Sequence, residues 1–229
     1  MQYTWLLFDA DNTLFDYDVA EGNALRTTLD SYGIASGPEH LETYRQINAR
    51  LWRVFEKGSI SAPEIRIQRM QELFSFYKLD LDPGEFSQAY LAGLSAGSDL
   101  IEGAEVVVKA LGEHYRLAII TNGFAAVQRP RLSGSPIHDC FEVVNISEEI
   151  GIAKPHVGFF EAAFESLGNP PREEALIIGD SLTSDMQGGM NYGVDTCWFN
   201  PTGASRDNKY RLTYEIKRLQ ELLSLLLPR

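Results

Sequence analysis

The chain has 229 residues, of which 44% are hydrophobic and 23% are charged, enough to bury a sizeable core in one large domain or in a domain with an inserted smaller one. Its formal net charge of −12 argues against a nucleic acid polymer or an anionic membrane as partner, because both attract basic surfaces. Two cysteines are too few for a disulfide framework, and neither a signal peptide nor a membrane-spanning run is seen, so we expect a cytoplasmic protein.

The first predicted element is a short buried strand in the apolar run that begins at Trp5 and stops at Asp9-Ala-Asp-Asn-Thr13. From about residue 17 to residue 96 the apolar residues recur at helical spacing, and glycines and prolines divide this stretch into roughly four helices. Asp82 is expected to be the N-cap of one of them, with Pro83 at its first helical position. We therefore predict an all-helical domain, residues 17–97, inserted after the first strand.

Strands and helices alternate over the rest of the chain. Further strands are predicted at 116–121, 141–146, 175–179 and 194–199, and helices at 105–113, near 125, at 157–167, 183–192 and 216–227. Pro130 should make the helix near residue 125 short, kinked or interrupted, with a restart after Arg129. The alternation predicts an α/β domain, residues 1–16 and 98–229, with a doubly wound, mostly parallel, Rossmann-like sheet.

Polar residues stand where these predicted strands end, and parallel strands bring such ends to one edge of a sheet. They are Asp9 and Asp11 after the first strand, Thr121, Asn122 and Gly123 after the second, Lys154 after the third, and Asp180 and Asp185 after the fourth. Converging carboxylates repel one another without a cation, and oxygen ligands suit Mg²⁺. The predicted Mg²⁺ ligands are Asp9, Asp11, Asp180 and Asp185. Mg²⁺ beside a lysine, a threonine and main-chain N–H groups in turn indicates a phosphate.

These residues divide the work of phosphoryl transfer between them. Asp9 can be the nucleophile that forms an aspartyl-phosphate, and Asp11 can protonate the leaving oxygen and then activate water. Lys154 can neutralise charge on the phosphoryl oxygens, and Thr121, Asn122 and Gly123 can bind them. For Asp185 three roles stay open, which are binding the metal directly or through water, orienting Lys154, and capping the following helix.

The motifs resemble, in order and over essentially the whole chain, the four motifs of the haloacid dehalogenase superfamily. They are Asp9-Ala-Asp-Asn-Thr13, Thr121-Asn-Gly, Lys154-Pro155 and Gly179-Asp-Ser-Leu-Thr-Ser-Asp185. The resemblance implies that the helical insert is a cap closing over the active site. It also implies a phosphatase, because the dehalogenases of this superfamily lack a counterpart of Asp11.

More narrowly, several segments resemble bacterial pyrimidine 5′-nucleotidases, although residues 129–136 depart from their regular helix. The segments are Phe8 to Phe15, Ile47 to Trp52 with Gly58, Thr121 to Phe124, Ile146 to Pro155 and Thr196 to Asn200. This implies a small phosphorylated substrate, a nucleoside monophosphate such as UMP or dTMP, with Trp52 either stacking on the base or packing in the core.

Other functions stay open at this point. They are a sugar-phosphate or phosphoglycolate phosphatase, a phosphomutase, and a phosphate-binding regulatory protein with the same fold. The chain could be a monomer or a homodimer.

Overall fold

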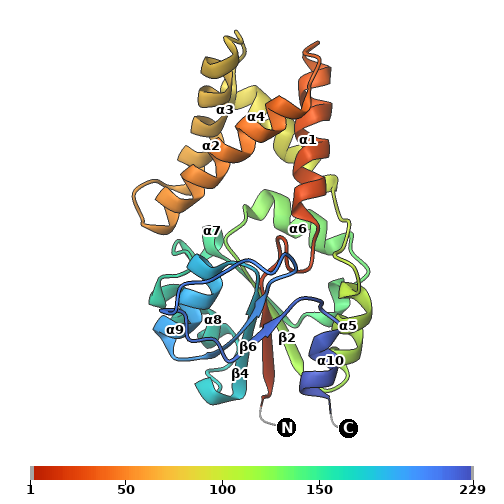
Figure 1. Cartoon of the computed structure of the whole chain (residues 1–229), viewed down its shortest axis with the longest axis vertical. Helices are drawn as coiled ribbons and strands as arrows, with labels where there is room; N and C mark the ends of the chain where they lie inside the picture. Colours follow the sequence, from red (N-terminus) through yellow and green to blue (C-terminus); the bar gives the residue numbers. More distant parts are fainter. Residues whose placement is uncertain (1–2, 228–229) are drawn as a thin grey trace. The chain divides into compact units, whose positions relative to one another are not determined.

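The computed structural model describes residues 3–227, which fall into two compact units (Figure 1). The first, here called the sheet unit, contains the residues up to Asp16, the segment Ser98–Ala125 and the residues from Leu132 onward. The second, here called the helical unit, contains Tyr17–Gly97 and Ala126–Arg131. Residues 1–2 and 228–229 of the predicted α/β domain lie outside the described part. Within residues 3–227, no helix is long and apolar enough to cross a membrane.

The described residues of the sheet unit contain a six-stranded sheet. Its strands are β1 (Trp5–Phe8), β2 (Arg116–Thr121), β3 (Val143–Ile146), β4 (Ala175–Gly179), β5 (Asp195–Phe199) and β6 (Tyr214–Ile216). They lie in the order β3-β2-β1-β4-β5-β6, and every neighbouring pair is parallel. The predicted parallel α/β class is therefore confirmed, and the carboxyl ends of β1, β2 and β4 meet at one edge.

Helices cover both faces of this sheet (Figure 1). They are α5 (Ala104–Gly112), α7 (Ser147–Ile150), α8 (Val157–Ser166), α9 (Gln187–Tyr192) and α10 (Glu221–Leu226), with short turns η1 (His138–Cys140) and η2 (Arg172–Glu174) and a π-helical turn η3 (Leu182–Met186). Along β1, Leu6 and Phe8 pack in the apolar layer of α5 and α10, whereas Trp5 and Leu7 pack in the layer of α8 and α9. Burial on both faces explains why β1 is continuously apolar.

The C-terminal end of the sheet unit differs from the prediction. The terminal helix begins at Glu221 and not at Ile216, because residues 214–216 pair as β6 with the edge of β5. Helix α6 (Ala125–Ser133) contains Pro130 and is short, at nine residues, which is one of the three outcomes predicted for it. A proline removes only its own N–H bond to the preceding turn, and a helix this short has few such bonds to lose.

The described part of the helical unit contains α1 (Tyr17–Ser31), α2 (Pro38–Glu56), α3 (Ala62–Tyr77) and α4 (Pro83–Ala96), as predicted. Asp82 caps α4 as expected, because its side chain accepts a 2.8 Å bond from Glu85 N and Pro83 follows it. A capping box starts α3, where Glu64 accepts bonds from the main-chain N–H and the hydroxyl of Ser61. The role of this unit as a cap stays a prediction.

A chain of buried polar side chains links the helices of this unit. Asn48 donates to Glu21 at 3.1 Å, and Arg69 donates to Asn48 at 3.4 Å. The Arg69 guanidinium also lies 4.9 Å from the centre of the Tyr90 ring. Burial raises the pKa of Glu21, and its contact with Arg45 opposes that rise. These two hydrogen bonds form only when Glu21, Asn48 and Arg69 are all in place. This series of buried bonds therefore fixes how α1, α2 and α3 pack.

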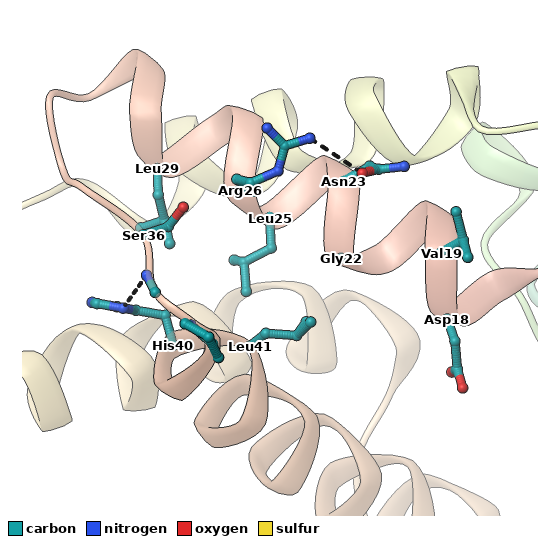
Figure 2. A pocket seen from close by; sticks show the side chains of 12 residues that line it. Asp18, Val19, Gly22, Asn23, Leu25, Arg26, Leu29, Ser36, His40 and Leu41 are labelled. Carbon is teal, nitrogen blue, oxygen red and sulfur yellow. Dashed lines mark hydrogen bonds between the residues drawn. The ribbon is translucent and has the colours of Figure 1, made fainter.

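A groove of about 460 Å³ lies within the same unit, between α1 and the start of α2 (Figure 2). Leu25 points across it toward Leu41, while Arg26 turns to Asn23, with which it forms a 3.2 Å hydrogen bond. At the other side, His40 Nδ1 accepts a 3.1 Å bond from Gly37 N. The groove is lined mainly by aliphatic groups, whereas Arg26 and His40 bond to their own neighbours.

Candidate active site

Asp9 stands directly after β1, with its carboxylate buried. Its main-chain N–H donates to Ile178 O at 2.8 Å, which ties the loop to β4. The loop then folds back tightly, because the N–H groups of both Leu14 and Phe15 donate to Ala10 O at 2.9 Å. Asn12 has a φ of 59°, a left-handed conformation that asparagine tolerates better than most residues. This tight loop fixes the position of Asp11, which is half-buried.

Lys154 lies beside Asp9, and its side chain is 1% exposed. Its Nζ is 2.7 Å from Asp9 Oδ1, 2.6 Å from Asp185 Oδ1 and 2.7 Å from Ile120 O. An ammonium group has three N–H donors, so all three have protein acceptors here. Lys154 therefore orients Asp9 and compensates its charge, and a contact with a phosphoryl oxygen would require it to exchange one of these acceptors.

The residues after β2 hold the loop that carries Lys154. The Asn122 side chain donates to Lys154 O and accepts from Lys154 N, both at 2.9 Å. Because its side chain is bonded to Lys154 in this way, Asn122 would contact a phosphate through its main-chain N–H. Thr121 is buried, and its Oγ1 accepts a 3.0 Å bond from Gly123 N. Because a hydroxyl can donate as well as accept, Thr121 keeps a proton for a phosphoryl oxygen.

Asp185 is fully buried on the π-helical turn η3 after β4. Its Oδ2 accepts a 3.1 Å bond from Ser181 N, while Oδ1 takes Lys154. A side chain at Gly179 would place its Cβ 2.3 Å from Asp185 Oδ2, so glycine is required for this close approach. The side chain that caps η3 is Ser181, which accepts from Ser184 N at 3.2 Å. Of the open roles for Asp185, the geometry supports the orientation of Lys154 and leaves capping to Ser181.

Asp9, Asp180 and Asp185 can each offer a carboxylate oxygen such that the three oxygens lie within 4.8 Å of one another. Among the described residues, the group does not include the carboxylate of Asp11. These carboxylates form an all-oxygen ligand set, and Lys154 bonds to some of its oxygens. Such a set fits a hard divalent cation such as Mg²⁺, which keeps several waters. The assignment of Asp11 as a metal ligand stays a prediction.

The electrostatics of this cluster show that its negative charges are only partly compensated. Burial raises the pKa of Asp9 to about 7, with Asp185 adding to the rise and Lys154 opposing it. Burial, and then the charge of Asp9, raise the pKa of Asp180 well above its usual range. Burial lowers the pKa of Lys154, but Asp185 and Asp9 outweigh it and the net shift is upward. A bound cation would supply the missing positive charge.

The structure brings Asp9, Thr121, Lys154 and Asp185 into one site of the sheet unit, together with Asp180. Trp52 is on α2 of the helical unit, half-buried, with its ring edge-on to Phe55 at 5.3 Å. Its contact with a base stays a prediction.

Two contacts of Asp180 were not predicted from the sequence. Thr13 Oγ1 lies 3.5 Å from Asp180 Oδ1, and Trp198 Nε1 donates to Asp180 O at 2.8 Å. Both residues belong to segments that resemble family motifs, Asp9 to Thr13 and Thr196 to Asn200. That membership was the available signal, although it did not specify a role.

Comparison with known proteins places these features in a family. The family model described as haloacid dehalogenase-like hydrolase matches residues 6–199. Pyrimidine 5′-nucleotidase YjjG of Escherichia coli (strain K12) is 33% identical over 99% of this chain and 99% of its own. Pyrimidine 5′-nucleotidase PynA of Streptococcus pneumoniae (strain ATCC BAA-255 / R6) is 37% identical over 99% of this chain and 96% of its own.

A solved structure is similar over the whole length. It is that of the HAD-hydrolase YfnB from Bacillus subtilis, described as bound to magnesium and as revealing interdomain movement. It is 36% identical, covers 100% of both chains and superposes with a TM-score of 0.94. The matching family model, the full-length relatives and the four motifs at one sheet edge agree, and the chain belongs to the haloacid dehalogenase-like hydrolases.

Proposed function

We propose that this hydrolase is a Mg²⁺-dependent phosphatase that cleaves pyrimidine nucleoside 5′-monophosphates, such as UMP and dTMP, through an aspartyl-phosphate on Asp9. The observation that carries the proposal is the buried Asp9 carboxylate, held by Lys154 at 2.7 Å beside Asp180 and Asp185. The choice of substrate is supported by two full-length relatives that are named pyrimidine 5′-nucleotidases.

In the proposed reaction, Asp9 attacks phosphorus with the carboxylate oxygen that Lys154 does not hold. Lys154 keeps the other oxygen in place, so the nucleophile needs little reorganisation before attack. Thr121 and the N–H groups of the loop after β2 bind the phosphoryl oxygens as charge spreads over them. Mg²⁺, held by carboxylates of this cluster, would supply further positive charge for the phosphoryl group.

Asp11 takes the role of general acid and base. It lies two residues after the nucleophile, half-buried in the tight loop that follows β1. It protonates the leaving 5′-oxygen in the first displacement and removes a proton from the attacking water in the second. The helical unit is proposed to act as a cap, and the interdomain movement described for YfnB supports that role.

A panel of phosphate esters tests the substrate. We expect kcat/KM for UMP and dTMP to exceed that for sugar phosphates and phosphoglycolate by about tenfold or more, since extra contacts with the base add binding energy in the transition state. Purine nucleotides serve as matched comparators with the same ribose phosphate. Sugar phosphates or phosphoglycolate hydrolysed as fast as UMP would overturn the substrate, and net transfer without phosphate release would indicate a phosphomutase.

Mg²⁺ affinity should depend on pH. The folded, metal-free protein holds a proton on Asp9 below about pH 7, whereas the unfolded chain releases it near the ordinary carboxyl pKa of 3.8. Protonation therefore stabilises the metal-free fold, and this stabilisation is lost as the pH rises through 7. Mg²⁺ needs the ionised carboxylate, so the proton on Asp9 alone should lower its affinity by up to about tenfold per pH unit below that pKa, and the raised pKa of Asp180 adds to this fall.

Thermal shifts and calorimetric titrations with Mg²⁺ at about pH 6 and pH 8 measure this effect, with ionic strength held constant. The rise in Tm on adding Mg²⁺ should be larger at the higher pH. An affinity that does not change over this range would contradict the assigned coupling between Asp9 and the metal.

A further inference from the structure

The peptide group between Asp180 and Ser181 is held from both ends. On one end, the carbonyl of Asp180 accepts a 2.8 Å bond from Trp198 Nε1. On the other end, Ser181 N donates to Asp185 Oδ2 at 3.1 Å. A peptide group is planar, so its C=O and N–H directions cannot turn independently. The two bonds therefore fix the orientation of this planar peptide group, which links Asp180 to Asp185 of the proposed metal cluster.

Trp198 is placed for this contact by the sheet. It lies on β5 directly opposite Gly179 of the neighbouring strand β4, and it is only 4% exposed. Its ring packs in the apolar layer of α8 and α9, which limits the directions in which the indole N–H can point. The bond reaches beyond the ladder of strand pairs to the loop that carries Asp180. Among Phe, Tyr and Trp, only tryptophan combines a large apolar ring with an N–H donor.

We propose that Trp198 is a positioning residue of the Mg²⁺ site. Its bond fixes the orientation of the Asp180–Ser181 peptide group. That peptide group in turn fixes the main chain of Asp180 and, through Ser181 N, the orientation of the Asp185 side chain. Asp185 in turn holds Lys154 at 2.6 Å, and Lys154 holds Asp9 at 2.7 Å. The inference rests on the proposed function in one respect, because it takes these carboxylates to hold Mg²⁺.

Loss of the indole N–H would remove the bond that holds the carbonyl of Asp180. The peptide could then rotate about the bonds on either side, which moves the Asp180 carboxylate and loosens the acceptor of Ser181 N. Mg²⁺ requires near-ideal octahedral geometry, so a small displacement of a ligand weakens its binding. Groups that orient metal ligands from behind typically contribute a factor of about 10 to 100 in affinity.

The test is calorimetric titration of Mg²⁺ into the substrate-free protein, comparing wild type, Trp198→Phe and Trp5→Phe. Trp5 is the matched control, because it is 1% exposed in the same apolar layer and contacts the Arg116 guanidinium, 4.0 Å from its ring centre, through the ring. We expect the Kd for Mg²⁺ to rise by about ten- to a hundredfold in Trp198→Phe and to stay at the wild-type value in Trp5→Phe. High Mg²⁺ should restore most of the lost kcat.

A Trp198→Phe protein that binds Mg²⁺ like wild type would overturn the inference. If that variant does not fold, benzothienylalanine at position 198 keeps the ring and removes only the N–H, and the same rise in Kd is expected. Because no substrate is present, a wrong substrate assignment leaves the result intact. Absence of Mg²⁺ binding in wild type as well would overturn the proposed metal site, and the inference with it.

Discussion

Replacement of Asp9 by asparagine should abolish phosphate release, lowering kcat for UMP by roughly ten-thousand- to a millionfold. The amide is almost the same shape as the carboxylate, but it is a poor nucleophile and cannot form the acyl phosphate. Single-turnover phosphate release with excess enzyme measures the effect. Turnover that survives the change at more than about a hundredth of the wild-type rate would contradict the assigned nucleophile.

The same variant should not lose stability, which separates a chemical effect from a folding defect. Burial raises the pKa of Asp9 to about 7, so above that pH the ionised carboxylate lowers the stability of the metal-free protein. Asparagine cannot ionise, and the Tm of Asp9→Asn without Mg²⁺ at about pH 8 should equal or exceed that of wild type. Asp139→Asn is the control for removal of a carboxylate, since the Asp139 side chain is fully exposed and should affect neither rate nor Tm.

Replacement of Lys154 by methionine should lower the free energy of unfolding by roughly 3–5 kcal/mol at neutral pH, because it leaves buried carboxylates without their cation. Asp9 and Asp185 would then face each other with no charge between them. Lys154 holds down the pKa of Asp9, so in the variant Asp9 binds a proton at a higher pH than in wild type, and the deficit should shrink as the pH falls because this proton removes the repulsion. Urea unfolding of the metal-free protein at several pH values measures both effects.

Lys109→Met provides the matched control for Lys154→Met. Lys109 forms a 2.6 Å ion pair with Glu105 on the same helix, and both side chains are about half exposed. Exposed pairs contribute little because water screens them, so this variant should unfold like wild type. Equal stabilities of the two methionine variants would contradict the view that Lys154 compensates buried charge.

The order of strands and helices could be predicted from the sequence because hydrophobic periodicity and the Gly and Pro positions act locally. The apolar run at β1 and the N-cap at Asp82 are both of this kind. β6 could not be predicted in this way. It has three residues, and its strand conformation depends on pairing with the edge of β5, a contact between distant parts of the chain.

The candidate site divides in the same manner. Its acidic and basic residues could be predicted from the sequence, because a charged side chain at the end of a buried strand costs free energy unless it is paired or binds a metal. The individual contacts within the site could not be predicted, because the fold alone brings Lys154 to Asp9, Asp185 and Ile120 O. The pairing of Asn122 with the main chain of Lys154 and the bond of Trp198 to Asp180 are likewise tertiary contacts. Sequence patterns indicate the chemistry of a site better than they indicate the groups that orient it.

The proposed covalent route through Asp9 is tested most directly by the steric course at phosphorus. The substrate is UMP whose phosphoryl group is replaced by a thiophosphoryl group made chiral with oxygen isotopes, hydrolysed in isotopically labelled water. Each in-line displacement inverts the configuration, so transfer to Asp9 followed by attack of water should give thiophosphate with net retention. Net inversion would show that water attacks the substrate directly, and it would contradict the aspartyl-phosphate.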